Sequence, residues 1–519
     1  MQAALRGRSL GFSLLKSLGF GRKTKSAKAY YTGMGFEGAQ MRRRLSTWQP
    51  TRASMTQLVS ADGEQLRARS RDLLRNNPYV ASAAESFVAN LVGAGIKPSP
   101  LLQDPSMKDG LQLLWREWTD QADFSGQTDF YGMQALVARA LFEAGECFIR
   151  FRSGSNNMPG VPLQLQLLES EMLAYNKNHM ADDGNQIING IELDGNDRRI
   201  AYWFYSVYPG DPYYRVHPLT YVRVPADEVL HIYRPLRPGQ MRGVPWITPS
   251  IVKLFLVDQY DDAELERKRL AAMYAGFVTS AAPEAMFDED DDVAPDGEPG
   301  PFPVLEPGTI QSLLPGEDIK FSEPAEAGNS YEPFQYRNLL AASSGMGVPY
   351  MAATGDNAKA NYSSSRQSLV EFRNRLTQLQ HSCMVFQMCR PIWARWLRDA
   401  VISGEVDIPD FLQNRRKYLK VKWIPPRFDW IDPLKDGQAE KLLVDNGYKS
   451  RSDVIEELGF DPEETDRRIA ADQKRVRDLG ILLTDSPLGQ SLSKTPPADD
   501  SDPDQAESHE EQLEGDATR

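Results

Sequence analysis

The sequence predicts an α+β protein built from several structural units, and three observations lead to this expectation. Between residues 130 and 235, short segments alternate apolar and polar residues as antiparallel strands do. Before and after them, longer segments repeat apolar residues at helical spacing. The 519 residues, with 35 Pro and 38 Gly, are enough for several units joined by many turns.

The first 59 residues are expected to form a flexible, basic arm. Residues 1–75 hold 15 Lys and Arg against 4 Asp and Glu, although the whole chain has a net charge of −13. A helix lying on a membrane surface is the second interpretation of this arm. The longest apolar run of the chain is interrupted by Lys253 and is shorter than the ~20 residues of a membrane-spanning helix. We therefore expect no stable membrane insertion.

Residues 60–245 are expected to combine helices with one mainly antiparallel sheet. Two helical patterns meet at Asn77-Pro78. In "LQLLWREWTD", Trp115 and Trp118 share the apolar face of a further helix, where we expect them in the core. The segment "IINGIELDGNDRRIAYWFYSVY" predicts a hairpin that turns at Asp194-Gly195, and "VLHIYR" predicts another strand.

The second half of the chain alternates long helices with polar segments. The sequence predicts a helix over 246–278, an acidic Pro- and Gly-rich insert over 279–330, a second helix over 331–348 and a polar loop over 349–362. A long helix follows, and Pro391 is expected to kink it. Three shorter helices are expected after it, starting at Asp432, at Ser450 or Ser452, and at Asp461.

No pattern in the chain predicts a catalytic centre, a cofactor or a metal site. There is no Gly-x4-Gly-Lys-Ser/Thr loop for a nucleoside triphosphate, and the Gly-x-Gly-x-x-Gly match at Gly33 has no apolar strand before it. Glu228 and His231 have Glu-x-x-His spacing, but on a strand, and the chain has 5 His and 3 Cys. We therefore expect His231 to be a hydrogen-bonded residue of the sheet and the chain not to be an enzyme.

The acidic insert has a run of five acids near its start. These are Asp288, Glu289, Asp290, Asp291 and Asp292. They lack the alternate-residue spacing and the closing Glu of a calcium-binding loop. Two interpretations stay open: a solvated acidic face, and acid that keeps a polyanion from adhering inside a narrow passage.

Several segments, in the same order along roughly residues 55–485, resemble the portal proteins of lambda-like tailed bacteriophages. They are "RARSRDLLRNNPY", "NLVGAGIKP", the Trp115/Trp118 helix, "VPADEVLHIYRPLRPGQMRGVPW", "DQYDDAELERKRLAAMYAGFV" and "WIDPLKDGQAEKLLVDNGYKSRSDVIEELGFDPEE". The resemblance implies a ring, usually of twelve subunits, at one capsid vertex, through which double-stranded DNA is packaged, retained and ejected. It implies docking of the terminase and then of a head-completion adaptor, contact with the major capsid protein, assembly in the host cytoplasm and a final location in the virion.

Portal subunits are divided into wing, stem, clip and crown, and the resemblance implies the same division here. The expected units are a basic arm (1–59), a wing of antiparallel sheet plus helices (60–245), a first stem helix (246–278), a small α/β clip insert (279–330), a second stem helix (331–348), a tunnel loop (349–362), a long helix with returning wing (363–430), a helical crown (431–485) and a disordered acidic tail (486–519). Twelve helices ~10 Å across would close a ring with a bore of ~28 Å, wide enough for a duplex about 20 Å across.

The resemblance also suggests three groups of functional residues. Candidates for the DNA channel are Asp356, Asn357, Lys359, Asn361, Tyr362 and Arg366; for terminase and adaptor docking, Asp288 to Asp292; and for the wing–stem hinge and subunit interface, Arg234, Arg237, Arg242 and Trp246. The last group lies in "HIYRPLRPGQMRGVPW", which joins the sheet to the first stem helix, and its arginines are expected to contact acids of a neighbouring subunit. Lys359 is expected to make weak phosphate contacts, and an ordinary solvated cation is the other interpretation.

The alternative function is another head–tail structural component or a component of the packaging machinery such as a terminase subunit. The missing triphosphate loop and the missing cluster of metal ligands argue against a terminase. We therefore expect a structural, DNA-conducting ring without a cofactor.

Overall fold

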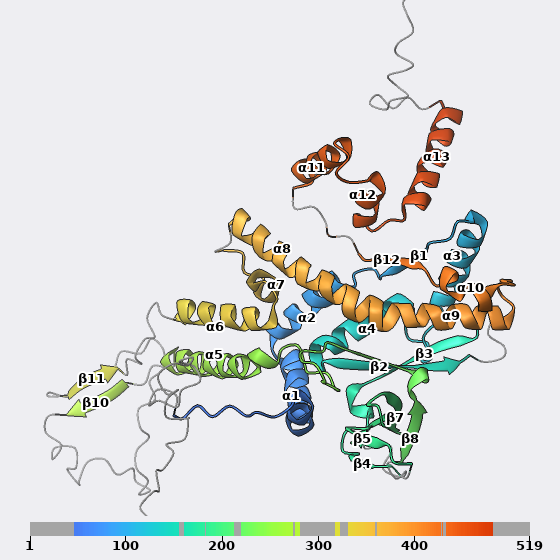
Figure 1. The fold of residues 1–519 in the computed structure, drawn as a ribbon. Helices are drawn as coiled ribbons and strands as arrows, with labels where there is room; N and C mark the ends of the chain where they lie inside the picture. The colour runs from blue at the N-terminus through green and yellow to red at the C-terminus, as the bar shows by residue number, and fades with distance from the viewer. Residues whose placement is uncertain are drawn as a thin grey trace, which may run out of the picture.

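The computed structural model describes residues 46–154, 160–181, 183–211, 220–272, 276–280, 317–321, 331–358, 361–426, 428 and 432–480 (Figure 1). The helices are α1 (Met55–Asn76), α2 (Pro78–Leu91), α3 (Pro105–Thr119), α4 (Phe130–Glu143), α5 (Ile251–Ala272), α6 (Tyr331–Met346), α7 (Tyr350–Thr354), α8 (Tyr362–Leu379), α9 (Arg390–Ser403), α10 (Phe411–Tyr418), α11 (Pro433–Asp445), α12 (Arg451–Glu457) and α13 (Pro462–Asp478). The strands are β1 (Lys97–Pro100), β2 (Glu146–Ser153), β3 (Leu163–Leu168), β4 (His179–Met180), β5 (Gln186–Ile188), β6 (Ile191–Leu193), β7 (Arg199–Tyr205), β8 (Tyr221–Pro225), β9 (Val229–Tyr233), β10 (Gly276–Ser280), β11 (Glu317–Phe321) and β12 (Val421–Ile424). The α+β class predicted from the sequence is therefore confirmed.

Side-chain caps fix where the first helices begin. The Ser54 hydroxyl accepts from the backbone N–H of Gln57, and the Gln57 side chain accepts from the backbone N–H of Ser54, so α1 starts at Met55, inside the segment expected as a flexible arm. The side-chain carbonyl oxygen of Asn77 accepts from the backbone N–H groups of Tyr79 and Val80 at the start of α2. The predicted boundary at Asn77-Pro78 is confirmed.

The strands between residues 146 and 233 form two antiparallel sheets rather than the one that was predicted. One sheet has the order β3-β2-β9 and the other β4-β5-β6-β7-β8. The physical reason lies in β2: Cys147 and Ile149 pack into the main core, whereas Phe148, on the opposite face, packs into a second core with residues of β6, β7 and β8. The predicted hairpin is present as β6 and β7, and the backbone N–H of Asp194 donates to the carbonyl of Arg198 at its turn.

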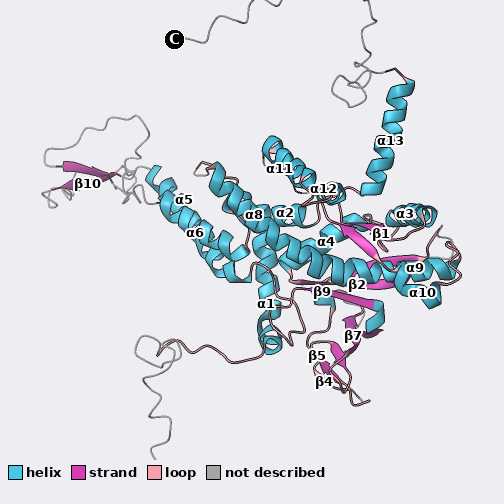
Figure 2. Cartoon of the chain, turned by 45° about the horizontal axis from the view of Figure 1, so that its top comes forward, coloured by secondary structure: helices cyan, strands magenta, loops and turns pink. Residues whose placement is uncertain are grey.

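The main core lies between α2, α3, α4 and the returning helix α9 (Figures 1 and 2). Trp115 and Trp118 are almost completely buried there, as predicted. The ring centroid of Trp115 lies 5.0 Å from the centroids of both Trp393 and Trp396. Because these indoles come from α3 and α9, tilted and edge-to-face contacts between aromatic rings join segments almost 280 residues apart.

The long helix after the polar loop continues past Pro391 through a segment of wider turns. α8 continues into a π-helical segment, Gln380–Cys389, and then into α9, which has Pro391 in its first turn. The backbone N–H of Arg390 donates to the carbonyl of Val385, five residues before it. Such a wide turn makes room for the proline ring, which would otherwise clash with the carbonyl four residues back. The helix changes direction between α8 and α9 (Figure 1), and the π-helical segment just before Pro391 lies between them.

Helices α5 and α6 lie side by side and extend away from the body, with β10 and β11 at their far end (Figure 1). Residues 276–278 were expected to end the helix, but residues 276–280 form β10, which pairs antiparallel with β11. The sequence "GFVTS" explains this difference, because a Gly followed by an aromatic and two β-branched residues favours a strand. The prediction of a helix up to residue 278 was wrong in its last turn.

The last three helices begin at the caps that were predicted for them. Asp432, Ser450 and Asp461 each accept a backbone N–H in the first turn of α11, α12 and α13. The group contacts the body through charged side chains: Lys108 Nζ of α3 lies 2.7 Å from Glu463 Oε2, and the Ser99 hydroxyl contacts the Asp461 carboxylate. These helices therefore attach to the body by polar rather than apolar contacts.

Candidate functional site

The segment between β9 and α5, residues 234–250, connects the sheets to the pair of long helices and is here called the hinge segment. Its loop turns at Gly239, where φ is +77°. The Gln240 side-chain carbonyl accepts from the backbone N–H groups of Leu236 (2.8 Å) and Arg237 (3.3 Å). The Thr56 hydroxyl of α1 donates to the Gly239 carbonyl at 3.0 Å. The loop is thus closed on itself and also fixed to the first helix.

A buried carboxylate, Glu146 at the start of β2, lies at the centre of this junction. Arg242 Nε lies 2.8 and 3.0 Å from its two oxygens, and a second Arg242 nitrogen, Nη2, also contacts it. The backbone N–H of Gly243 donates at 2.7 Å, His231 Nε2 lies at 2.9 Å, and the Ser170 hydroxyl donates as well. Three other parts of the chain therefore converge on this one carboxylate.

This geometry corrects the expectation for Arg242. Its side chain is 2% exposed and pairs with Glu146 of its own chain. It is therefore not available to an acid of a neighbouring subunit. This pair has little local signature, because Glu146 precedes Arg242 by 96 residues. The one sign of it in the sequence is a charged residue at the start of the apolar strand "ECFIRF".

The charges of the cluster follow from burial and from these partners. Burial alone would raise the pKa of Glu146, but the Arg242 guanidinium and the hydrogen bond to His231 together hold it well below its usual value. Burial lowers the pKa of His231 to about 4, although Glu146 acts in the opposite direction. Because Arg199 Nη1 lies 3.2 Å from His231 Nδ1, that nitrogen accepts and Nε2 carries the proton donated to Glu146. His231 is thus a hydrogen-bonded sheet residue, as predicted, and its partner is Glu146 rather than Glu228.

Two glycines allow the backbones to cross beside this cluster. Gly145 has φ +84°, and a Cβ on it would lie 2.1 Å from the backbone carbon of Val244. A Cβ on Gly243 would lie 2.2 Å from the carbonyl oxygen of Gly145. Any side chain at either position would force β2 and the hinge segment apart.

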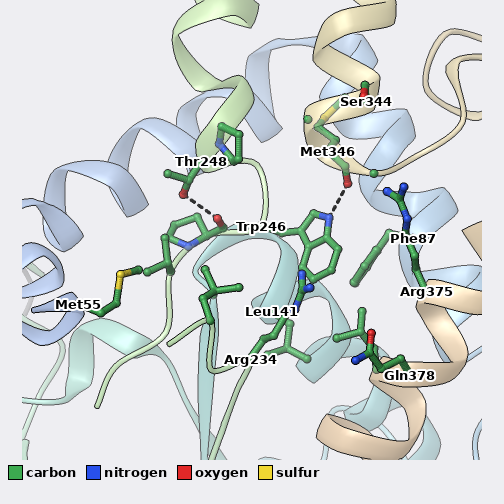
Figure 3. Close-up of a pocket in the computed structure, with 18 residues that line it drawn as sticks. Met55, Phe87, Leu141, Arg234, Trp246, Thr248, Ser344, Met346, Arg375 and Gln378 are labelled. Carbon is green, nitrogen blue, oxygen red and sulfur yellow. Dashed lines mark hydrogen bonds between the residues drawn. The ribbon is translucent and has the colours of Figure 1, made fainter. Parts of the chain in front are cut away.

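Trp246 joins the base of α5 to the end of α6 (Figure 3). Its indole N–H donates to the Met346 carbonyl, and the Arg234 guanidinium lies 4.6 Å from the ring centroid on one side. The Phe87 ring lies 5.2 Å from it. Nearby, the Ser250 hydroxyl donates to the Ala342 carbonyl at 2.8 Å. These contacts hold the two long helices together where they leave the body.

A mainly apolar cavity of about 440 Å³ opens beside Trp246. Its walls come from α1, α2, α4, the hinge segment, α6 and α8, and include Met55, Leu141, Pro245, Met346 and Leu379. Arg234 and Arg375 bring two cations to it (Figure 3). Arg237 lies on the exposed side of the hinge, where its guanidinium contacts the Ala53 carbonyl at 3.4 Å.

The structure describes part of the predicted tunnel loop. The Asp356 carboxylate accepts from the Tyr350 hydroxyl (3.2 Å) and from the backbone N–H of Ala358 (2.9 Å), so it shapes the loop itself. Asn357 is exposed, and Asn361 caps α8 by accepting from the backbone N–H of Ser364. Lys359 lies outside the described residues, and Tyr362 begins the backbone of α8.

Arg366 has a partner that sequence reasoning missed. Its Nη2 lies 2.9 Å from the Asp436 carboxylate of α11, so the start of α8 is tied to the last three helices. The pair is partly exposed and separated by 70 residues in the chain. The acids of the predicted docking site, Asp288 to Asp292, lie outside the described residues.

The described part of the chain contains no group of three His, Cys, Asp or Glu side chains that could hold a metal ion. Among the same residues, no helix is long and apolar enough to cross a membrane. The buried cluster around Glu146 is closed by its own hydrogen bonds, so its arrangement suits a structural junction.

Comparison with known proteins gives one consistent result. The family model described as "Phage portal protein, lambda family" matches residues 41–380. The chain is 26% identical over 470 residues to a probable portal protein of Halomonas phage phiHAP-1, covering 88% of this chain and 89% of that protein. It is 22% identical over 481 residues to portal protein B of Escherichia phage lambda, covering 83% and 86%. A solved structure of the neck of a native gene transfer agent particle matches 76% of this chain and 94% of its own, at 15% identity and a TM-score of 0.42.

Proposed function

This chain belongs to the lambda family of phage portal proteins, and on that premise we propose that twelve copies form a ring at one capsid vertex. As a portal protein it acts in the phage capsid. The proposed ring conducts double-stranded DNA during packaging, retains it and later releases it. It assembles in the host cytoplasm and remains in the virion at the portal vertex.

The pair of long helices, α5 and α6, is the observation that carries this proposal. They leave the body together, held at their base by Trp246–Met346 and Ser250–Ala342 (Figures 1 and 3). Along α5 the apolar side chains of Val252, Phe255 and Leu256 are exposed. Apolar residues on a projecting helix are expected to pack against the next copy in a ring, because water would otherwise surround them.

We propose that the tunnel loop contacts DNA without reading its sequence. The candidates for weak contacts to phosphate are Asn357, which is exposed, and Lys359, which lies outside the described residues. Asp356, Asn361 and Arg366 have partners within the chain, so we assign them to the shape and attachment of the loop. Uniform, salt-sensitive contacts fit a channel through which every base pair must pass.

The acids Asp288 to Asp292 are proposed to dock the terminase during packaging and a head-completion adaptor afterwards. The wing is proposed to contact the major capsid protein. Support for these partners comes from family membership and from the local concentration of negative charge in the sequence.

Native mass spectrometry of the purified full-length chain, with negative-stain microscopy of the same sample, tests the proposed ring. We expect assemblies of about twelve chains with a central hole. A chain that stays monomeric across the concentrations accessible to both methods would contradict the proposal.

A further inference from the structure

Four exposed cations lie close together at the end of α10 and just after it. They are Arg415, Arg416, Lys417 and Lys420, here called the α10 basic patch. None of the four forms an ion pair with any residue in the described part of the chain, and Lys417 Nζ lies 5.1 Å from the centroid of the Tyr418 ring. The whole chain carries a net charge of −13, so this patch runs against its overall balance.

The local fold accounts for the position of the patch. Phe411 and Tyr418 are buried and anchor the two ends of α10, which leaves the residues between them facing solvent. The nearby acid, Asp410, has both carboxylate oxygens bound by neutral donors: the Tyr418 hydroxyl at 2.6 Å and the Asn414 side-chain amide at 2.7 Å. The carboxylate that could have paired with a patch arginine is therefore already engaged.

Helix stabilisation does not explain four unpaired cations. A cation at a helix C-terminus contributes about 0.3–1 kcal/mol through the helix dipole, and the effect is limited to the last turn. Lys420 lies beyond α10, next to the start of β12. In α13, by contrast, Arg468 pairs with Glu464 and Arg475 with Asp472, so exposed arginines there are neutralised within the helix.

The patch lies far from the proposed channel. Figures 1 and 2 show α10 at the end of the body opposite to α5, α6 and β10. If the long helices surround the channel, α10 lies at the outer edge of the ring. DNA that meets this patch is therefore outside the channel rather than inside it.

We propose that the α10 basic patch binds the phosphate backbone of double-stranded DNA at the outer edge of the ring. A duplex presents one negative charge per about 1.7 Å of its axis, so neighbouring cations engage neighbouring phosphates. Contacts of this kind do not depend on base sequence. The inference rests on the proposed function only because packaging is what brings DNA to the ring.

Fluorescence anisotropy with a labelled duplex of about 30 base pairs tests the patch on the full-length, assembled protein. The variant replaces Arg415, Arg416 and Lys417 by Ala, and a matched control replaces Arg451, Arg468 and Arg475 of α12 and α13. We expect the patch variant to bind at least about tenfold more weakly at ~0.1 M salt, because each lost phosphate contact removes up to about 8-fold there. The slope of log K against log salt should fall by up to about 2.7, with little change in the control.

Three results would overturn the inference. The first is a patch variant with the same affinity and slope as the parent. The second is a control variant that loses as much affinity as the patch variant, which would show an effect of total charge. The third is a patch variant that binds duplex normally but is not incorporated into capsids with the major capsid protein, which would make the patch a protein-binding surface. A variant with Arg415→Lys and Arg416→Lys, which keeps the charges, is expected to bind like the parent. Failure of the proposed ring is recognised separately, because native mass spectrometry of the parent chain measures it without DNA.

Discussion

Replacing Arg242 by Met removes the charge opposite Glu146 while keeping a side chain of similar length. Glu146 is completely buried, and Arg242 reaches both of its oxygens through Nε. His231, Gly243 and Ser170 remain as hydrogen-bond donors, but none of them is a cation, because His231 is neutral near pH 7. Removal of one partner from a buried ion pair costs about 3–5 kcal/mol, since the remaining charge is left without compensation.

Hydrogen exchange measured by mass spectrometry follows this cost at the junction itself. Amides of β2 and β9 that exchange by local opening are expected to exchange at least about 100-fold faster in Arg242→Met, because 1.36 kcal/mol corresponds to a factor of ten. Combining the change with Glu146→Gln should restore much of the protection, because no unpaired charge then remains buried.

An exposed ion pair provides the control. Arg468→Met removes the partner of Glu464 on the surface of α13 and is expected to cost only about 0.3–0.5 kcal/mol. If exchange in β2 and β9 of Arg242→Met stayed within about twofold of the parent, the cluster around Glu146 would not stabilise the hinge, and the reasoning from its geometry would fail.

Three further predictions concern the hinge and the loop. The pKa of His231 is about 4 in the folded chain and about 6.5 in the unfolded chain. The contribution of neutral His231 to stability is therefore complete above pH 6.5 and falls by about 1.4 kcal/mol per pH unit down to pH 4. Thermal melting should show this fall, and His231→Gln should reduce it. Gly243→Ala should lower the melting temperature and the yield of rings because its Cβ meets the Gly145 carbonyl, whereas Gly110→Ala, in open space on α3, should not destabilise. Lys359→Ala should leave rings intact but alter packaged DNA length or yield; identical values would make Lys359 a bystander.

Local signals in the sequence were sufficient for many of the elements. Asp432, Ser450 and Asp461 start helices because a short polar side chain can accept the free backbone N–H groups of a first turn, and this depends only on neighbouring residues. The burial of Trp115 and Trp118 also followed from their spacing.

Pairings between distant segments were not accessible in the same way. Arg242 appeared to be an exposed cation of a loop because its partner, Glu146, lies on a strand almost a hundred residues earlier. The division into two sheets depends on which face of β2 holds Phe148, and alternation alone does not show what covers each face. Pro391 predicted a change of direction in the helix, but the wide turn just before it has no local signature in the sequence.

The contacts that join α5 and α6 at their base have a consequence for how the region between them can vary. Trp246–Met346 and Ser250–Ala342 fix the two helices relative to each other before the chain departs toward the insert. The entropy of closing that loop then grows slowly with its length, by about 0.6 kcal/mol for each doubling. The body is thereby insulated from changes beyond the helices. We therefore predict that variants differing in length or charge between β10 and β11 keep the same fold of the body and nearly the same stability.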